Sequence, residues 1–349
     1  MFYLKYRPQN IEELDNQQVK NQVKKIFLSQ KIPHGLLFTG QKGTGKTSTA
    51  RIFAKAINCL NNDFANNKKN IINFEPCNQC KNCLNIINST FPDVVELDAA
   101  SNRGIEEVKK LIQETFYLPM IGRYRVFIID EAHMITNDGF NAFLKTLEEP
   151  QKSVVFILAT TNLDKIPKTI QSRLIKINFG KAKINDIILM LRRICKKENL
   201  FLNDEFLKLI AKHSDNSFRD AAKILEEVLI QKITTINQLE GFLGLRGKRN
   251  LLEIIEKKDL KITLNWIDEF SQNGGSFKSL IEELLDQLRV QLLIKKGLKL
   301  DENEEESKLT IKEITRLIKL LMEAYQLLKS SPIESLPLEI ALIEFYNEF

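Results

Sequence analysis

One glycine-rich segment has a spacing suited to holding phosphate groups. Residues 40–47 follow the pattern Gly-x4-Gly-Lys-Thr. Glycines let backbone N–H groups approach phosphate oxygens closely, and the dipole of a following helix favours an anion. Lys46 is predicted to reach the β- and γ-phosphates, and Thr47 to bind Mg²⁺. A plain glycine-rich turn is disfavoured because an apolar strand pattern precedes the segment and a helical pattern follows it. The other predicted phosphate-binding residues are Gly40, Gly43, Thr44, Gly45 and Ser48.

A second segment ends in two adjacent carboxylates. Four apolar residues, 126–129, precede Asp130 and Glu131 and predict a buried strand. Ligands of open α/β sheets bind at the carboxyl ends of strands. Asp130 is therefore predicted to hold Mg²⁺, mostly through water, and Glu131 to polarise the attacking water. Together the two segments predict hydrolysis of a nucleotide and not binding alone.

The cysteines suggest a metal site. Three of them follow C-x2-C-x2-C spacing, and four thiolates in a tetrahedral array suit structural zinc. An iron–sulfur cluster is the alternative, but Ile87 stands where its fourth cysteine would fall. Cys195 stands alone in a helical pattern and is expected to be a small buried side chain. The predicted zinc ligands are Cys59, Cys77, Cys80 and Cys83.

The elements that must position these residues form two patterns. Apolar runs of strand length alternate with helical patterns up to Gly180, which predicts an α/β fold with a mainly parallel sheet. After Gly180 a period of about 3.6 residues dominates and predicts helices only. The expected strands are 36–40, 93–97, 125–130, 154–160 and 174–179. The expected helices are 46–58, 104–116, 138–148, 184–198, 203–213 and 217–232, with a further helical set from 236 to 349.

Composition sets the broad class. The 349 residues are 43% hydrophobic and 28% charged, which fits a globular protein of two or three domains. No apolar run approaches the length of about 20 residues that a membrane span needs, and the first residues lack the apolar core of a signal peptide. The expected location is the cytoplasm. A net charge of +6 permits contact with nucleic acid but does not require it.

Several segments, in order, resemble the AAA+ clamp-loader ATPases, and among them the gamma/tau subunits of bacterial DNA polymerase III. The resemblance covers most of residues 1–235 and, more loosely, the helical remainder. It implies an AAA+ P-loop domain at 1–178 with a zinc module inserted at about 59–88, an all-α lid at 179–240 and an all-α collar at 241–349. The segments that carry it are 6–8, 98–101, 117–119, 130–134, 140–150 and 159–161.

The resemblance also implies roles for single residues. Thr160 or Thr161 falls at the sensor-1 position beside the γ-phosphate. Arg173, in the Ser-Arg motif, would enter the ATP site of a neighbouring subunit, although Leu174 replaces the usual cysteine. Arg219 falls at the sensor-2 position of the lid. The alternative for either arginine is a surface salt bridge.

The resemblance also carries weaker assignments. Arg7, Pro8 and the segment to Gln17 match the region that packs near adenine, with an ordinary N-terminal arm as the alternative. Residues 101–103, at a helix start, match a site for DNA phosphate, with a plain helix cap equally open. The gap between the first two cysteines is longer than the family pattern. His133 belongs to a matched segment, but no catalytic role is assigned to it.

The expected function is that of an ATP-driven clamp-loader subunit. It would act with other clamp-loader subunits in a pentameric ring, with a sliding clamp and with primer–template DNA, but without a membrane and without polymerase chemistry of its own. The alternatives are a nucleotide-independent structural subunit of the same complex and an AAA+ branch-migration helicase. The chain resembles the short, gamma-like form, so coupling to the helicase is expected to be absent or supplied by another chain.

Overall fold

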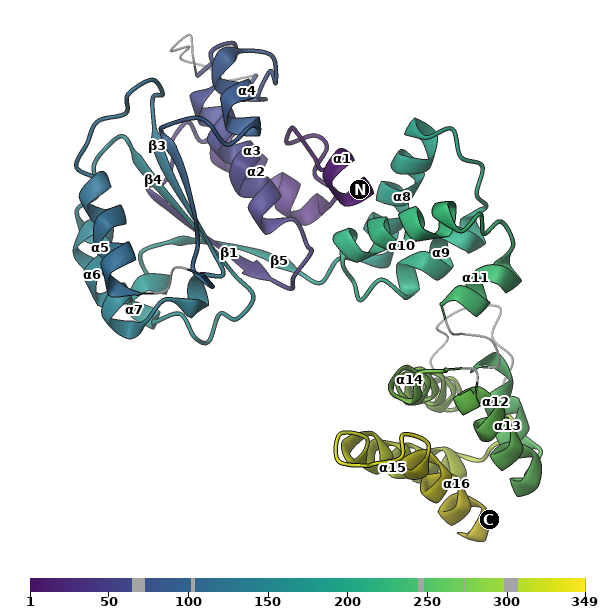
Figure 1. The fold of residues 1–349 in the computed structure, drawn as a ribbon. Helices are drawn as coiled ribbons and strands as arrows, with labels where there is room; N and C mark the ends of the chain where they lie inside the picture. Colours follow the sequence, from purple (N-terminus) through teal and green to yellow (C-terminus); the bar gives the residue numbers. More distant parts are fainter. Residues whose placement is uncertain (65–72, 102–103, 244–247, 273, 298–306, 349) are drawn as a thin grey trace. The chain divides into compact units, whose positions relative to one another are not determined.

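A computed structural model describes residues 1–64, 73–101, 104–243, 248–272, 274–297 and 307–348 (Figure 1). Clustering of contacts divides the chain into two units, Met1–Ile233 and Thr234–Phe349. Residues 102–103 of the suggested DNA site lie outside the described residues, and so does the acidic stretch 301–306. The three-domain division stays a prediction.

The first unit is built on a parallel sheet of five strands in the order β2-β3-β4-β1-β5, which confirms the predicted α/β fold. Three central strands are continuous apolar runs with almost no exposed residue, as a sheet covered on both faces requires. The strands are β1 (Gly35–Gly40), β2 (Val94–Asp98), β3 (Arg125–Asp130), β4 (Val154–Thr160) and β5 (Ile175–Gly180).

Helices cover both faces of this sheet (Figure 1). On one face lie α2 (Gln17–Leu28), α3 (Lys46–Asn58) and the short α4 (Lys81–Ile87). Phe27 and Phe53 join the first two, with ring centroids 4.9 Å apart, inside the core that this face buries. On the other face lie α5 (Ile105–Glu114), α6 (Asn137–Glu148) and α7 (Lys168–Gln171), with a 3₁₀ turn, η1 (Ala132–Met134), after β3.

Three amphipathic helices follow β5 within the same unit. They are α8 (Ile184–Lys197), α9 (Asp204–Lys212) and α10 (Phe218–Ile230), each within three residues of its predicted bounds. Asn203 and Ser217 cap the last two by accepting hydrogen bonds from backbone N–H groups. The N-terminal α1 (Phe2–Lys5) packs against α10. Cys195 is buried in α8, as expected.

The second unit consists of helices and connecting turns in its described residues. Thr235 and Thr310 each begin a helix with a capping box. Among the described residues, no helix is both long enough and apolar enough to cross a membrane. The helices are α11 (Ile236–Phe242), α12 (Lys248–Glu256), α13 (Leu260–Gln272), α14 (Phe277–Lys295), α15 (Ile311–Leu327) and α16 (Leu336–Glu348).

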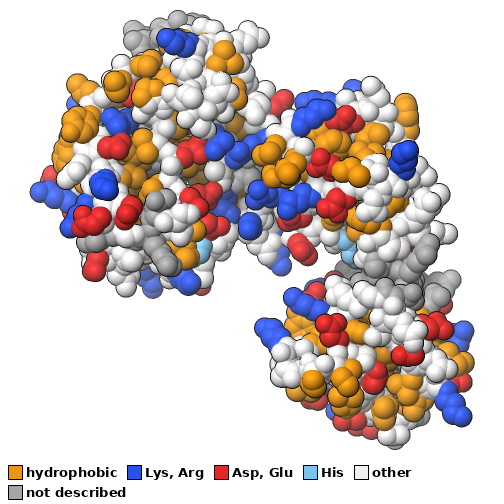
Figure 2. Space-filling view, in the orientation of Figure 1, with side chains coloured by type: hydrophobic (Ala, Val, Ile, Leu, Met, Phe, Trp, Pro, Cys, Tyr) orange, Lys and Arg blue, Asp and Glu red, His pale blue; other side chains and the backbone are white. Residues whose placement is uncertain are grey.

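The face that Figure 2 shows carries side chains of both charges. Figure 2 shows acidic and basic side chains interspersed on each unit, in line with the net charge of +6. Contact with a polyanion would therefore depend on a few placed side chains and not on a general positive field.

Candidate functional site

The glycine-rich segment forms the turn between β1 and α3, as predicted. Gly43 and Gly45 have φ angles of 78° and 97°, a left-handed conformation that residues with a Cβ adopt at a penalty. Gly45 is the N-cap of α3, so the first N–H groups of that helix point into the turn. This geometry suits the phosphate binding that the sequence predicts for the segment, which we call the phosphate loop.

A cavity of about 340 Å³ lies beside this loop. Its polar lining includes residues 42–49 and the carboxylates of Asp130 and Glu131. Part of its apolar lining comes from β5, α8 and α10. These apolar residues, which the sequence did not single out, are Phe179, Met190, Ile194, Phe218 and Ala222. A pocket with one polar and one apolar set of walls suits a ligand that joins a phosphate chain to a ring.

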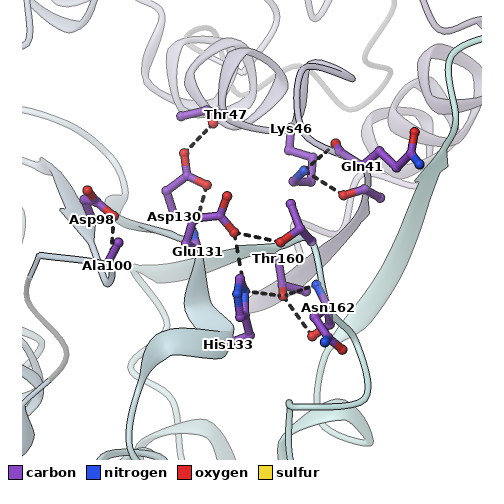
Figure 3. A network of polar contacts seen from close by, with 12 residues as sticks. Gln41, Lys46, Thr47, Asp98, Ala100, Asp130, Glu131, His133, Thr160 and Asn162 are labelled. Carbon is purple, nitrogen blue, oxygen red and sulfur yellow. Dashed lines mark hydrogen bonds and ion pairs between the residues drawn. The ribbon is translucent and has the colours of Figure 1, made fainter. Parts of the chain in front are cut away.

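Lys46 is the first residue of α3, and its side chain is buried. Its ammonium donates to the carbonyl oxygens of Gly40 at 2.8 Å and Gln41 at 2.7 Å (Figure 3). Burial lowers the pKa of Lys46, while Glu131 and Asp130 act in the opposite direction. The charge is thus held by the loop itself, at the place where the sequence predicts phosphates.

Thr47 and Asp130 meet although they are far apart in sequence. Thr47 Oγ1 donates to Asp130 Oδ2 at 2.6 Å, and the backbone N–H of Glu131 donates to Asp130 Oδ1 at 2.9 Å. Glu131 has a left-handed backbone with φ of 46°, which is uncommon for a residue with a side chain. Such conformations cluster at functional sites, where the surrounding fold holds them.

The carboxylate of Glu131 belongs to a network that reaches β4 (Figure 3). Its Oε2 accepts from Thr161 Oγ1 at 3.1 Å and lies 3.3 Å from His133 Nδ1. The same His133 nitrogen lies 3.1 Å from Thr160 Oγ1. Thr160 is fully buried and its hydroxyl also donates to the carbonyl of Asn162. His133 therefore links Glu131 to Thr160, while Thr161 bonds to Glu131 directly; the sequence did not predict the part played by His133.

The N-terminal arm reaches the cavity. Arg7 and Pro8 line it, and Arg7 Nε donates to Ser48 Oγ at 2.6 Å. Burial lowers the pKa of Arg7, and the nearby Arg51 adds to this effect. Arg219 also lines the cavity, with its guanidinium 4.8 Å from the ring centre of Tyr3. Two predicted contact arginines therefore converge on the cavity from opposite ends of the first unit.

Asp15, within the segment to Gln17 that the resemblance assigned to the adenine region, also lines the cavity. Burial raises the pKa of Asp15 to about 7, opposed by the adjacent Arg193. Arg193 of α8 approaches Asp15 Oδ1 at 2.9 Å. This ion pair ties the helical part of the first unit to the segment before α2.

Arg173 lies away from the cavity. It follows α7, donates to the carbonyl of Thr169 at 2.6 Å and forms an ion pair with Glu148, its side chain 32% exposed. This is the surface pairing weighed as the alternative. The same exposure leaves the guanidinium available to a neighbouring molecule, which is what the trans role requires.

The cysteine cluster includes the uncertain fourth member. The sulfur atoms of the four predicted ligands all lie within 4.8 Å of one another, so Cys59 joins the other three despite the long insertion. The backbone N–H of Cys77 donates to Cys59 Sγ, and the N–H of Cys80 donates to Cys77 Sγ. Hydrogen bonds, foremost from the Cys83 thiol, lower the pKa of Cys59 to about 4. A thiolate surrounded by N–H donors is the form that binds metal.

The chain is similar to several known proteins. A family model described as DNA polymerase III, delta subunit, matches residues 15–183. The DNA polymerase III subunit gamma of Buchnera aphidicola (subspecies Schizaphis graminum) is 31% identical over 361 residues, covering 99% of this chain and 97% of that protein. The chain belongs to the gamma/tau subunit family of DNA polymerase III.

Another gamma/tau member shows how much of a longer relative is covered. The DNA polymerase III subunit tau of Bacillus subtilis is 35% identical over 299 residues. The match covers 84% of this chain and spans about half, 52%, of that subunit. Among solved structures, the RuvB Holliday junction branch migration motor of Thermotoga maritima matches 72% of this chain and 79% of its own at 17% identity, with a TM-score of 0.48.

The contact between the phosphate loop and α10 generates a prediction. A Cβ at Gly43 would lie 2.0 Å from Ser217 Oγ, which caps α10, whereas a Cβ at Gly45 would meet nothing within 4 Å. Both positions are left-handed, so alanine at either adds strain of about 1–3 kcal/mol. Gly43→Ala should also displace the cap, worth about 1 kcal/mol.

The measurement is thermal unfolding of the two variants without ligand. Gly43→Ala should lower the midpoint more than Gly45→Ala, which is the matched control for backbone strain alone. Equal shifts in the two variants would show that the loop and α10 are not in contact in solution.

Proposed function

We propose that this gamma/tau family member is an ATP-driven clamp-loader subunit. It binds ATP with Mg²⁺ in the cavity beside the phosphate loop and hydrolyses it. In a ring with other clamp-loader subunits it uses this cycle to load a sliding clamp onto primed DNA. The observation that carries the proposal is the convergence of Lys46, Thr47, Asp130 and Glu131 on one cavity, although they come from two distant segments.

The phosphate end of the cavity can accept a triphosphate with little rearrangement. The acceptors of the Lys46 ammonium are carbonyls of its own loop, which phosphate oxygens can replace. The loop supplies backbone N–H groups and the beginning of α3 supplies its dipole. The volume of about 340 Å³ falls within the range of about 300–1,000 Å³ usual for small-molecule sites.

Thr47 and Asp130 fit a Mg²⁺ ion. They bring a hydroxyl and a carboxylate oxygen within 2.6 Å, and hard oxygen donors are what Mg²⁺ prefers. The ion, when bound, neutralises charge on the phosphates. The chain itself holds these two oxygens in place. Asp130 stands at the end of β3, and Thr47 stands at the beginning of α3, directly after the phosphate loop.

Glu131 is proposed to orient and polarise the attacking water. The strained backbone aims its carboxylate at the cavity, and the side chains of His133 and Thr161 hold it from behind. Thr160 contacts His133, which contacts Glu131. Through these contacts Thr160 would couple the presence of the γ-phosphate to the position of the Glu131 carboxylate. His133 is thus a positioning residue, since it acts through Glu131.

The other end of the cavity would hold the base. Arg7 and Pro8 line it together with the apolar residues of α8 and α10, and Arg219 would reach the phosphates from α10. Tyr3 lies against that guanidinium and limits its directions. Binding of ATP would then draw the sheet, the arm and the helical part of the unit together.

The four cysteines are proposed to hold structural zinc. A tetrahedral site with Zn–S bonds of about 2.3 Å places its sulfurs about 3.8 Å apart. The observed separations, all within 4.8 Å, need only a small contraction. Four cysteine ligands complete a tetrahedral coordination, which suits a structural ion and not a catalytic one.

The intact hydrolytic residues argue against a purely structural subunit, and the gamma/tau relatives argue against a branch-migration helicase. The deciding experiment measures steady-state ATPase with the other clamp-loader subunits. Turnover should rise on primed DNA and rise again when the sliding clamp is added, because loading couples hydrolysis to both. A rate that ignores DNA and clamp would contradict the loader function.

Glu131→Gln tests the chemistry within that experiment. It should lower turnover by about 10²-fold or more while the affinity for a fluorescent ATP analogue stays within a few-fold, because the group acts on water and not on binding. Glu106→Gln, at an exposed position of α5, is the control and should change neither value. Normal turnover in Glu131→Gln would remove Glu131 from the mechanism.

Arg173→Ala tests the role in trans. The isolated chain should bind ATP as before, since Arg173 does not line its own cavity. The assembled complex should lose ATPase by a factor of about 10³, the size of arginine-finger effects. Arg192→Ala removes an arginine from a comparable exposed ion pair and should leave the complex active. Full activity of Arg173→Ala in the complex would contradict the role in trans, and the surface salt bridge with Glu148 would then be the only role of Arg173.

Zinc content tests the cysteine site. The purified chain should be colourless, and elemental analysis should give one zinc per chain and no iron. Cys59→Ser should lower the retained zinc and the thermal midpoint, because a neutral hydroxyl is a poor ligand. Cys195→Ser, which alters a buried cysteine outside the cluster, should keep its zinc. A brown protein containing iron would favour the iron–sulfur alternative.

A further inference from the structure

Lys55 is a buried charge that the proposed chemistry does not use. It lies in the last turn of α3, is 2% exposed and does not line the cavity. Its ammonium donates to three oxygens: the backbone carbonyl of Gln9 at 2.7 Å, the side chain of Gln9 at 2.8 Å and Asn78 Oδ1 at 2.7 Å. An ammonium has three donors, so it is fully satisfied, as a buried charge must be.

These acceptors come from two segments with different tasks. Gln9 follows directly on Arg7 and Pro8, which line the cavity. Asn78 lies between Cys77 and Cys80, inside the cysteine cluster, with a left-handed φ of 55°. One ammonium therefore joins the arm of the nucleotide cavity to the loop that carries two of the proposed zinc ligands.

A second contact runs in parallel. The carboxylate of Glu75, just before the cluster, accepts from the backbone N–H groups of Ile11 at 2.7 Å and Glu12 at 3.0 Å. At its other end the arm is fixed by the bond from Arg7 to Ser48, in the first turn of α3. The arm is thus held at three points, and two of them depend on the conformation of the cysteine segment.

We propose that Lys55 is a positioning residue that couples the cysteine site to the nucleotide cavity. A filled cysteine site fixes Asn78 and Glu75, these fix the arm through Gln9 and the N–H groups of Ile11 and Glu12, and the arm presents Arg7 to the cavity. The inference rests on the proposed function, in which the cavity takes ATP and the cysteines take zinc. Coupling between binding affinities is reciprocal, so ATP must also strengthen the binding of zinc.

The test uses the full zinc-loaded chain and two measurements. The first is the dissociation constant of a fluorescent ATP analogue, and the second is the fraction of zinc transferred at equilibrium to a chromogenic chelator with and without ATP. In the unaltered chain, ATP should reduce zinc transfer. Lys55→Met should weaken ATP binding about tenfold and abolish the effect of ATP on zinc transfer.

Variants of Asn78 separate coupling from general damage. Asn78→Gly removes the acceptor but suits the left-handed backbone, so it should reproduce the Lys55→Met effects. Asn78→Asp restores an acceptor and should restore both values. The double variant Lys55→Met/Asn78→Gly should bind ATP no more weakly than Lys55→Met alone, because both changes break the same contact. Lys81→Met, an exposed lysine at the other side of the cluster, is the control and should behave as the unaltered chain.

The outcomes are distinguishable. If the unaltered chain binds no ATP, the proposed function fails and this inference fails with it. If it binds ATP but its zinc transfer ignores ATP, or if Lys55→Met and Asn78→Gly keep their ATP affinity within twofold, the inference alone is overturned. Should Lys55→Met not fold, the pair Asn78→Gly and Asn78→Asp decides the question.

Discussion

The site depends on the order of three neighbouring strands. In the sheet, β4 lies between β1 and β3, and all run in the same direction. Their carboxyl ends therefore meet at one edge, where β1 delivers the phosphate loop, β3 the two carboxylates and β4 the threonines. The hydrogen bond from Thr47 to Asp130 closes this edge. A different strand order would leave the same motifs intact in the sequence but scattered in space.

Much of this arrangement could be predicted from the sequence, since it follows from local patterns. The predicted strand 125–130 contains the apolar run 126–129 just before two carboxylates, and β3 has those bounds. The helix over 46–58 likewise begins where the glycines end, and α3 has those bounds. These elements are specified by residues close together in the chain, so their pattern is visible without the fold.

Contacts between distant segments could not be predicted in this way. His133 carries no motif of its own, and only the fold brings its ring between Glu131 and Thr160. The same holds for Tyr3, which meets Arg219 across the first unit. The position of this histidine two residues after Glu131 was the available signal for the first, because a 3₁₀ turn brings such neighbours together. For Tyr3 the sequence offered nothing comparable.

The parallel pairing of β1 has a consequence for how the chain folds. Leu36 pairs with Ile157 on one side and Ile175 on the other, so β1 has no partner strand until most of the first unit has been synthesised. Long-range pairing of this kind slows folding and leaves apolar strands exposed on the way. The phosphate loop directly follows β1 in the chain. Because β1 pairs late, the geometry of this loop is among the last features of the first unit to form. A nascent chain cut short before β4 would carry the complete glycine motif and still have no site.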